Sequence, residues 1–151
     1  MCNPAHCPPD PAYAFGCAAN TKRALLKGAT FSASQRLGAW AMKAQLDLLR
    51  ARDQDSGAPL DRRANTQASA GADWTAAAWT LGAWLMHVGE RPDGGKTLAA
   101  ETTLDLLATW RVAPGWDLQA KVVNATNVDL EPARDYQGLG RQAWISLRVK
   151  M

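Results

Sequence analysis

Apolar and polar residues alternate with a period of two along most of this chain. The pattern is clearest over residues 98–110, where one row is mostly Leu and Ala and the other carries Glu, Asp and Thr. Because successive side chains of a β-strand point to opposite faces, the pattern predicts strands with one apolar and one polar face. We expect seven strands, at residues 22–35, 40–52, 62–74, 79–90, 98–110, 116–124 and 140–150.

The main alternative to a strand concerns residues 39–50. Their apolar side chains also fit one stripe of a helix, and Ala, Leu and Lys favour helices. Gly38 and Trp40 are typical of a turn, however, and the period of two is clear in the other segments, so we predict a strand here as well. The members of the rival helical stripe are Ala39, Met42, Leu46 and Leu49.

Short turns flanked by tryptophan separate pairs of predicted strands. The far ends of the strands are joined by longer loops rich in Asp, Gly, Pro and Arg. Aromatic girdles, short turns on one side and long loops on the other are typical of an outer-membrane β-barrel, whose tilted strands need about 9–11 residues to cross the bilayer. Five of the seven Trp residues stand beside the short turns, namely Trp40, Trp74, Trp79, Trp110 and Trp116.

The polar rows favour a barrel over a soluble β-sandwich that binds a ligand or partner. In a sandwich the facing rows form a core. Here one row carries charges and amides, as expected of strands that face a water-filled or plugged lumen. Trp84 and Trp144 share the parity of the polar row, and we expect them to pack against something inside the barrel.

Hydropathy and charge argue against a transmembrane helix and against a nucleic-acid partner. No run of about 18 apolar residues indicates a transmembrane helix, and a formal charge of +3 with a pI near 8.9 gives no support to a nucleic-acid partner. The cations gather at strand ends, which indicates either a solvated loop surface or a basic rim that pairs with lipid phosphates or an anionic ligand. They are Arg50, Arg52, Arg62, Arg63, Arg91, Lys96 and Arg134 near the long loops, and Arg36, Arg111 and Lys150 near the turns.

Residues 1–21 form a Cys- and Pro-rich segment, interpreted as the remnant of an extracellular loop. All three cysteines, Cys2, Cys7 and Cys17, lie here, which suggests one disulfide and one further thiol. A metal site from Cys2, His6 and Cys7 is the alternative, but a CxxC knuckle and a fourth ligand are lacking, so no metal site is predicted. The beginning does not resemble a signal peptide, which indicates a cytosolic protein or a fragment.

The sequence contains no recognisable catalytic arrangement. Glu101 and Asp105 share one face of one predicted strand without a cleft, so we do not expect a general acid and base pair. His87 has outward parity near a loop end, which favours an interfacial role. We therefore predict no enzymatic activity, no catalytic or metal-binding residues and no cofactor, and no cofactor-binding residue can be named.

Four segments carry motifs in a fixed order. In residues 79–93 a Trp-Thr-Leu-Gly strand start leads to a Val-Gly-Glu-Arg-Pro-Asp loop. Thr-Leu-Asp-Leu follows at 103–106, Val-Val-Asn-Ala-Thr-Asn at 122–127 and Tyr-Gln-Gly-Leu-Gly-Arg at 136–141. In this order and spacing the motifs resemble the closing strands of TonB-dependent outer-membrane receptors.

The resemblance extends upstream and implies an architecture. Residues 53–64 resemble a loop and strand start common in cobalamin-type receptors, and residues 22–28 resemble the entry into the strand before it. The family's barrel has 22 strands around an N-terminal plug. The resemblance implies that residues 22–151 are the last seven strands, without the plug or its TonB box. Family chains usually end in an aromatic residue, and Met151 departs from that pattern.

The resemblance also implies a function and partners. Such receptors lie in the bacterial outer membrane and import cobalamin or an iron-siderophore with energy from the TonB complex, which acts through the plug. Lipid, the plug and the rest of the barrel would contact this chain, and its turns would face the periplasm. Loops at 53–61, 91–97 and 125–139 would help to capture the ligand, and residues 53–64 favour cobalamin. Seven strands leave two open edges, so the isolated chain is expected not to form a transporter.

Overall fold

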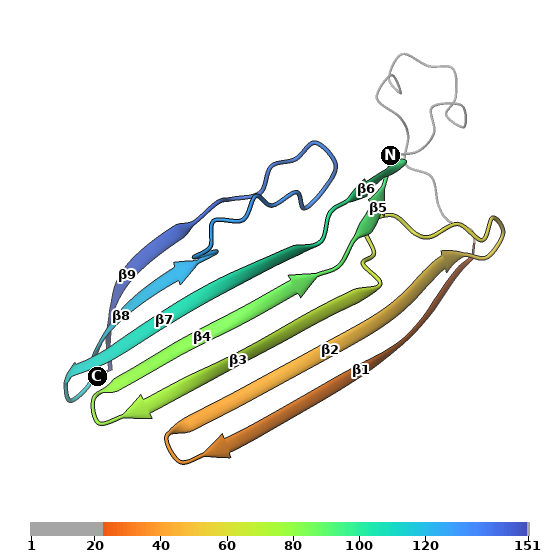
Figure 1. The fold of residues 1–151 in the computed structure, drawn as a ribbon. Coiled ribbons are helices and arrows are strands. Elements are labelled where there is room, and N and C mark those ends of the chain that lie inside the picture. The colour runs from red at the N-terminus through yellow and green to blue at the C-terminus, as the bar shows by residue number, and fades with distance from the viewer. Residues whose placement is uncertain (1–22, 151) are drawn as a thin grey trace.

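The computed structural model describes residues 23–150. Seven long strands form one antiparallel sheet in the order β1-β2-β3-β4-β7-β8-β9, a meander in which each pairs with the next (Figure 1). The predicted all-β meander is confirmed, whereas closure into 22 strands stays a prediction. The elements are β1 (Ala24–Leu37), β2 (Trp40–Asp53), β3 (Thr66–Ala76), β4 (Trp79–Val88), β5 (Arg91–Asp93), β6 (Lys96–Leu98), β7 (Glu101–Ala113), β8 (Trp116–Val123) and β9 (Gln142–Val149).

The alternatives to a barrel wall do not fit this arrangement. Residues 39–50, for which a helix was the rival, contribute their last eleven residues to β2. Within residues 23–150 no helix is long and apolar enough to cross a membrane. A β-sandwich needs two sheets packed face to face, but the long strands here belong to a single sheet.

The strand register gives the sheet one apolar and one polar face. Directly paired residues of antiparallel strands share a face. Leu46 of β2 pairs with Ala68 of β3, while their neighbours Gln45 and Ser69 pair on the other side. Ile145 on the apolar face is 80% exposed, an unfavourable position in water that lipid would accommodate. We call the apolar face outward and the polar face inward.

Five tryptophans form a belt on the outward face at the turn end of the sheet. Trp40 lies opposite Trp74, and Trp79 lies opposite Trp110. The rings of Trp79 and Trp110 stack with centroids 5.5 Å apart and planes 5° apart. Trp116 continues the belt on β8. The predicted aromatic girdle is therefore confirmed as one continuous structural feature.

The third strand begins later than predicted. β3 starts at Thr66, not at residue 62. Arg62 has a φ of 60°, its backbone N–H donates to the carbonyl of Pro92, and its guanidinium donates to Asp93. These contacts hold residues 62–64 outside the sheet, whereas the carbonyl of Asn65 already accepts the N–H of Leu49 in β2. Alternation alone cannot reveal them, because they depend on a segment thirty residues away.

Residues 91–98 form a hairpin, although they were predicted as a loop and the start of a strand. Gly94 and Gly95 join β5 to β6 with φ values of 58° and 84°, as a two-residue type I′ turn requires. Leu98 therefore ends this hairpin, and the next long strand begins at Glu101. The remaining strand bounds differ from the predicted ones by a few residues.

Trp84 lies on the inward face, as its parity predicted. It pairs with Gly71 of β3 and with Asp105 of β7. A Cβ at Gly71 would overlap the Trp84 ring, so the indole lies directly over this glycine. Cross-strand aromatic rings stabilise glycines in sheets in this way. Trp144 also lies inward, but packing of either ring against material inside a barrel stays a prediction.

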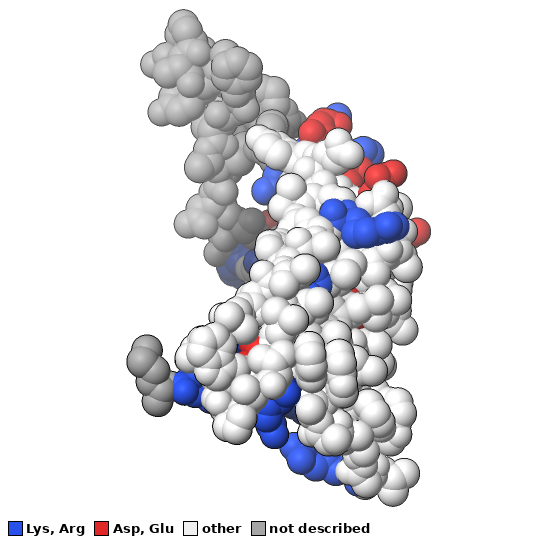
Figure 2. All heavy atoms as spheres, turned by 90° about the vertical axis from the view of Figure 1, so that its left-hand side faces the viewer, with Lys and Arg blue, Asp and Glu red and all other residues white. Residues whose placement is uncertain are grey.

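Most burial lies near the loop end of the sheet, and charges concentrate at the strand ends. On the side drawn in Figure 2, Asp and Glu gather mainly toward the loop end, Lys and Arg occupy both ends, and the middle is largely uncharged. Elsewhere the sheet is a single layer whose edges are β1 and β9. Glycines apart, the buried residues within 23–150 are Ala51, Ala64 and Leu98 among the apolar ones and Arg91, Asp93 and Asn124 among the polar ones.

A substitution at Gly71 tests the packing of Trp84. We expect Gly71→Ala in the full receptor to lower the free energy of unfolding by about 1–3 kcal/mol, because the added methyl group displaces the indole. Urea unfolding in detergent micelles, followed by tryptophan fluorescence, measures the change. In a Trp84→Ala background the same substitution should cost much less. An equal cost in both backgrounds would show that the ring does not pack on Gly71.

Candidate functional site

Three segments converge at the loop end of the sheet. They are the loop of residues 54–65, the β5–β6 hairpin, and the loop of residues 124–141, and we call them the loop platform. Hydrogen bonds join the hairpin to both loops. These segments overlap the three loops that the sequence predicted to act together in ligand capture. The structure brings all three into contact, although capture itself is not tested by this arrangement.

Asp93 is the carboxylate that links the hairpin to both loops. Its side chain is only 2% exposed. Its oxygens accept a hydrogen bond from Nε of Arg62, 3.1 Å away, and one from the backbone N–H of Arg134, 2.7 Å away. The Arg134 N–H, followed by the Arg62 guanidinium, outweighs desolvation and lowers the pKa of Asp93 below its ordinary value.

The tip of the hairpin is fixed by two further contacts. Nη1 of Arg134 donates to the carbonyl of Gly94 at 2.7 Å. The N–H of Gly94 donates to a carboxylate oxygen of Asp61 at 3.2 Å. Each neighbouring loop therefore contributes both to the Asp93 side chain and to the turn beside it, which gives the hairpin one orientation.

Arg91 forms a second junction beneath the hairpin. Its buried Nη2 donates to Oε2 of Glu101 at 3.2 Å and to the carbonyl of Glu131 at 2.8 Å. The other Glu101 oxygen accepts the backbone N–H of Glu131 at 2.6 Å. Nη1 of Arg91 is buried without a hydrogen-bond partner in the described part of the chain. Glu101, for which the sequence predicts no catalytic role, thus holds a loop in place.

Glu131 connects the Arg91 junction to exposed residues of the loop platform. Its side-chain oxygen accepts a hydrogen bond from Nζ of Lys96 at 2.7 Å and one from the N–H of Asp135 at 3.0 Å. The Lys96 bond, followed by the Asp135 bond, lowers the pKa of Glu131 below its ordinary value. The charge of Lys96 is therefore already matched within the loop platform.

Asn124 directly follows the last residue of β8 and is the first residue of the long loop. It is 1% exposed and has a φ of 50°, which Asn tolerates better than most residues. Its side chain exchanges two hydrogen bonds with the backbone of Val128, at 2.8 and 2.9 Å. Its N–H donates to Asp105 at 3.0 Å. Asp105, the second carboxylate considered for catalysis, therefore also has a structural contact.

A polar pocket of 440 Å³ opens beside these junctions. Its walls come from the start of β7 and from the long loop, and they include the exposed Tyr136. The carboxylates of Glu101 and Glu131 line it but already accept hydrogen bonds from Arg91 and Lys96. In residues 23–150 no group of three or more His, Cys, Asp or Glu residues could hold a metal ion. The pocket therefore offers a polar surface on which the carboxylates of Glu101 and Glu131 are already engaged by Arg91 and Lys96.

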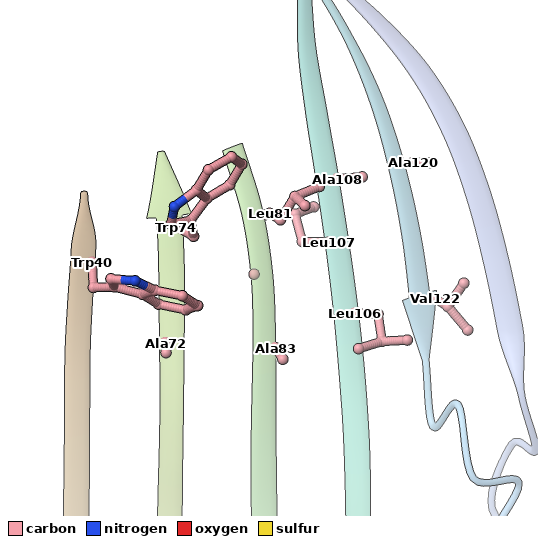
Figure 3. A pocket seen from close by; sticks show the side chains of 11 residues that line it. Trp40, Ala72, Trp74, Leu81, Ala83, Leu106, Leu107, Ala108, Ala120 and Val122 are labelled. Carbon is pink, nitrogen blue, oxygen red and sulfur yellow. The ribbon is translucent and has the colours of Figure 1, made fainter. Parts of the chain in front are cut away.

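The outward face has a hollow of a different character. It measures 580 Å³ and is lined mainly by Ala, Leu and Trp. In Figure 3 the indole of Trp40 extends from β2 across β3, and that of Trp74 extends toward β4, while Ala72 and Ala83 leave space beside them. An apolar hollow on the girdle side of the sheet suits lipid chains better than a polar ligand.

Two other sequence expectations have clear outcomes. His87 lies in the outward row near the loop end, where a ring nitrogen and the Thr102 hydroxyl are 2.8 Å apart, so its predicted outward position is confirmed. Cys2, His6, Cys7 and Cys17, with the rest of the Cys- and Pro-rich segment, lie outside the described residues.

A family model for the β-barrel of TonB-dependent receptor-like proteins matches residues 4–125. That match spans most of the chain and agrees with the meander, the girdle and the two-faced register. The chain belongs to this family of TonB-dependent receptor β-barrels. The predicted resemblance is confirmed, and with it a location in the bacterial outer membrane, where proteins of this family reside.

Solved structures of related barrels contain the same sheet. The ferric enterobactin receptor PfeA of Pseudomonas aeruginosa matches with a TM-score of 0.76 and 18% identity over 86% of this chain and 23% of that one. The copper transporter OprC gives 0.72 and 18% over 83% and 23%. The ferric-catecholate import receptor Fiu of E. coli K12 gives 0.72 and 15% over 82% and 20%. This chain thus spans less than a quarter of their length, and the likeness concerns the fold.

Acid should loosen the loop platform in this TonB-dependent receptor. Asp93 and Glu131 have lowered pKa values, so their stabilisation is complete above the ordinary values of 3.8 and 4.5 and is lost as pH falls through the lowered ones. We expect amides of residues 91–98 and 128–135 to begin to lose protection from hydrogen exchange as pH falls below about 5, and to lose more of it as pH falls further, after correction for intrinsic rates.

The β2 amides serve as the internal reference and should keep their protection. Asp93→Asn removes the charge at all pH values, so this variant should exchange faster in the hairpin already at neutral pH. Unchanged protection of residues 91–98 in acid and in the variant would mean that the ion pairs do not hold the loop platform.

Proposed function

We propose that this chain forms part of the wall of an outer-membrane receptor that imports an iron-siderophore complex. The single observation that carries the proposal is the joint presence of a family barrel sheet and a cross-linked loop platform at one end of it. The sheet supplies the membrane wall, and the loop platform supplies a shaped entrance. No step of covalent chemistry is assigned to the chain.

The choice of ligand is supported by the named neighbours and by the chemistry of the loop platform. Two of the neighbours described above are named for ferric enterobactin and ferric-catecholate import and one for copper. Cobalamin, favoured by residues 53–64 in the sequence, remains the alternative. Glu101 and Glu131 at the polar pocket already bind Arg91 and Lys96, and no cluster in residues 23–150 could hold a metal ion, which suits capture of a preformed metal complex better than direct chelation of a bare ion.

Exposed residues of the long loop are the proposed ligand contacts. Tyr136 is 68% exposed and lines the polar pocket, and Leu139 is 74% exposed nearby in sequence. Aromatic and apolar side chains with little conformational freedom make effective contacts at such surfaces. Arg62 and Lys96, by contrast, are held by Asp93 and Glu131 and act as supports.

The inward face provides the proposed contact with the plug. Its rows carry Lys43, Gln45, Ser69 and Trp84 around a pocket of 360 Å³. A polar face without a covering layer suits a folded domain inside the barrel. In this proposal the TonB complex acts on that domain and reaches the present chain only through it.

Uptake measurements on the full receptor test this function. In cells in which the receptor is the sole import route, Tyr136→Ala with Leu139→Ser should weaken ligand binding about tenfold or more, as loss of two central contacts does. Radiolabelled iron-siderophore and cobalamin uptake are measured in parallel. A change on the same loop outside the polar pocket, at the exposed Thr126 (Thr126→Ala), and surface labelling of the receptor control for loop structure and receptor amount.

The outcomes separate the ligand classes. Iron-siderophore uptake that depends on Tyr136 and Leu139 supports the proposal, whereas cobalamin uptake alone supports the alternative. If the full receptor imports neither compound, the proposed function is wrong.

A further inference from the structure

Two cations oppose each other on the outward face of the sheet. Lys27 of β1 pairs directly with Arg50 of β2, and the register places both in the row that contains Phe31 and Leu46. Like charges directly opposite on a strand pair are destabilising. Arg52 follows Arg50 in the same row, opposite Leu25. All three cations are exposed, and we call them the outward basic patch.

No carboxylate neutralises the outward basic patch in the part of the chain that the structure describes. Arg23 would extend the row, but its guanidinium binds Asp55 at 2.6 Å. Asp53 belongs to the opposite face, and one of its oxygens accepts two backbone N–H groups of the following loop. Arg52 has only a neutral contact, a hydrogen bond of 3.1 Å to the carbonyl of Gly57. Three positive charges thus remain without an anionic partner.

The depth of the outward basic patch in the membrane follows from the length of β2. Trp40, in the girdle, and Arg50 are ten residues apart on one strand. At about 3.4 Å per residue and a tilt of about 40°, they are separated by about 26 Å along the membrane normal. The apolar band of such barrels is about 25 Å tall. With Trp40 at one boundary, Arg50 and Lys27 therefore lie at the other.

From this placement we propose that Lys27, Arg50 and Arg52 bind the phosphate groups of anionic lipid headgroups in the leaflet at the loop end. Cations at the boundary of the apolar band meet headgroup phosphates, and charge-assisted hydrogen bonds from guanidinium to phosphate are among the stronger polar contacts. A bound phosphate also relieves the repulsion between Lys27 and Arg50. The inference rests on the family's location in the outer membrane and is independent of which ligand the receptor imports.

Lipid retention by the purified full receptor tests the proposal. The wild type and the triple variant K27Q/R50Q/R52Q are reconstituted in nanodiscs of phosphatidylcholine with a small fraction of bisphosphorylated lipid A. They are then extracted into detergent, and retained lipid is counted by native mass spectrometry. The triple variant should retain at least fivefold less lipid A, since each cation near the surface contributes about a fivefold preference for anionic lipid.

The matched control removes three cations from the inward face. Arg36, Lys121 and Arg148 belong to inward rows, and R36Q/K121Q/R148Q should retain lipid A as the wild type does. Lipid A without phosphates should be retained equally by the wild type and by the outward variant. Inorganic phosphate should not displace the bound lipid A. A heat-dependent shift in gel mobility, the same in each variant as in the wild type, verifies that each variant forms a folded barrel.

Three outcomes would overturn the proposal. They are equal retention of lipid A by the wild type and the outward variant, equal losses in the outward and inward variants, and a protein instead of lipid that co-purifies and is lost in the outward variant. Ligand uptake by the outward variant is measured separately. If the outward variant loses lipid A but imports the ligand normally, the headgroup site is supported. If the wild type retains lipid A but imports no ligand, only the proposed function is wrong.

Discussion

Backbone hydrogen bonding is the constraint on which the rest of this structure depends. Inside a bilayer no water can satisfy a free N–H or C=O group, so a strand that crosses it must pair along its length. The long strands meet this demand with nearly unbroken registers, such as the fourteen residue pairs between β1 and β2. Once pairing is fixed, the period of two decides which side chains face lipid, and the girdle and the outward apolar rows follow from it.

The same constraint explains where irregular structure occurs. The long irregular segments lie at the loop end of the sheet, where side chains form hydrogen bonds with their backbone N–H and C=O groups. Asp93 and Asn124 are buried because they serve backbone N–H groups that have no strand partner. The ion pairs of the loop platform are therefore structural requirements of long loops next to a membrane.

The sequence predicted the features that depend on local periodicity. Seven strands, three turns, the outward position of the five girdle tryptophans and the inward position of Trp84 and Trp144 all follow from side-chain spacing, because successive residues of a strand face opposite sides. The loop platform could not be predicted in this way, because Arg62, Asp93 and Arg134 are brought together by folding and no periodic pattern relates them. The β5–β6 hairpin does have a local signal, because Asp93-Gly94-Gly95 is a typical two-residue hairpin turn, and that turn implies that the next long strand begins only after Leu98.

The central claim is that alternate residues of each long strand face lipid and the barrel interior. Spin labels at successive cysteine-substituted positions of β3, from Gln67 to Asp73, test it most directly in the full receptor in bilayers. We predict that labels at Ala68, Ala70 and Ala72 are accessible to dissolved oxygen, that those at Gln67, Ser69, Gly71 and Asp73 are not, and that the collision rate alternates along the strand. A collision rate with oxygen that does not alternate along β3 would contradict the account.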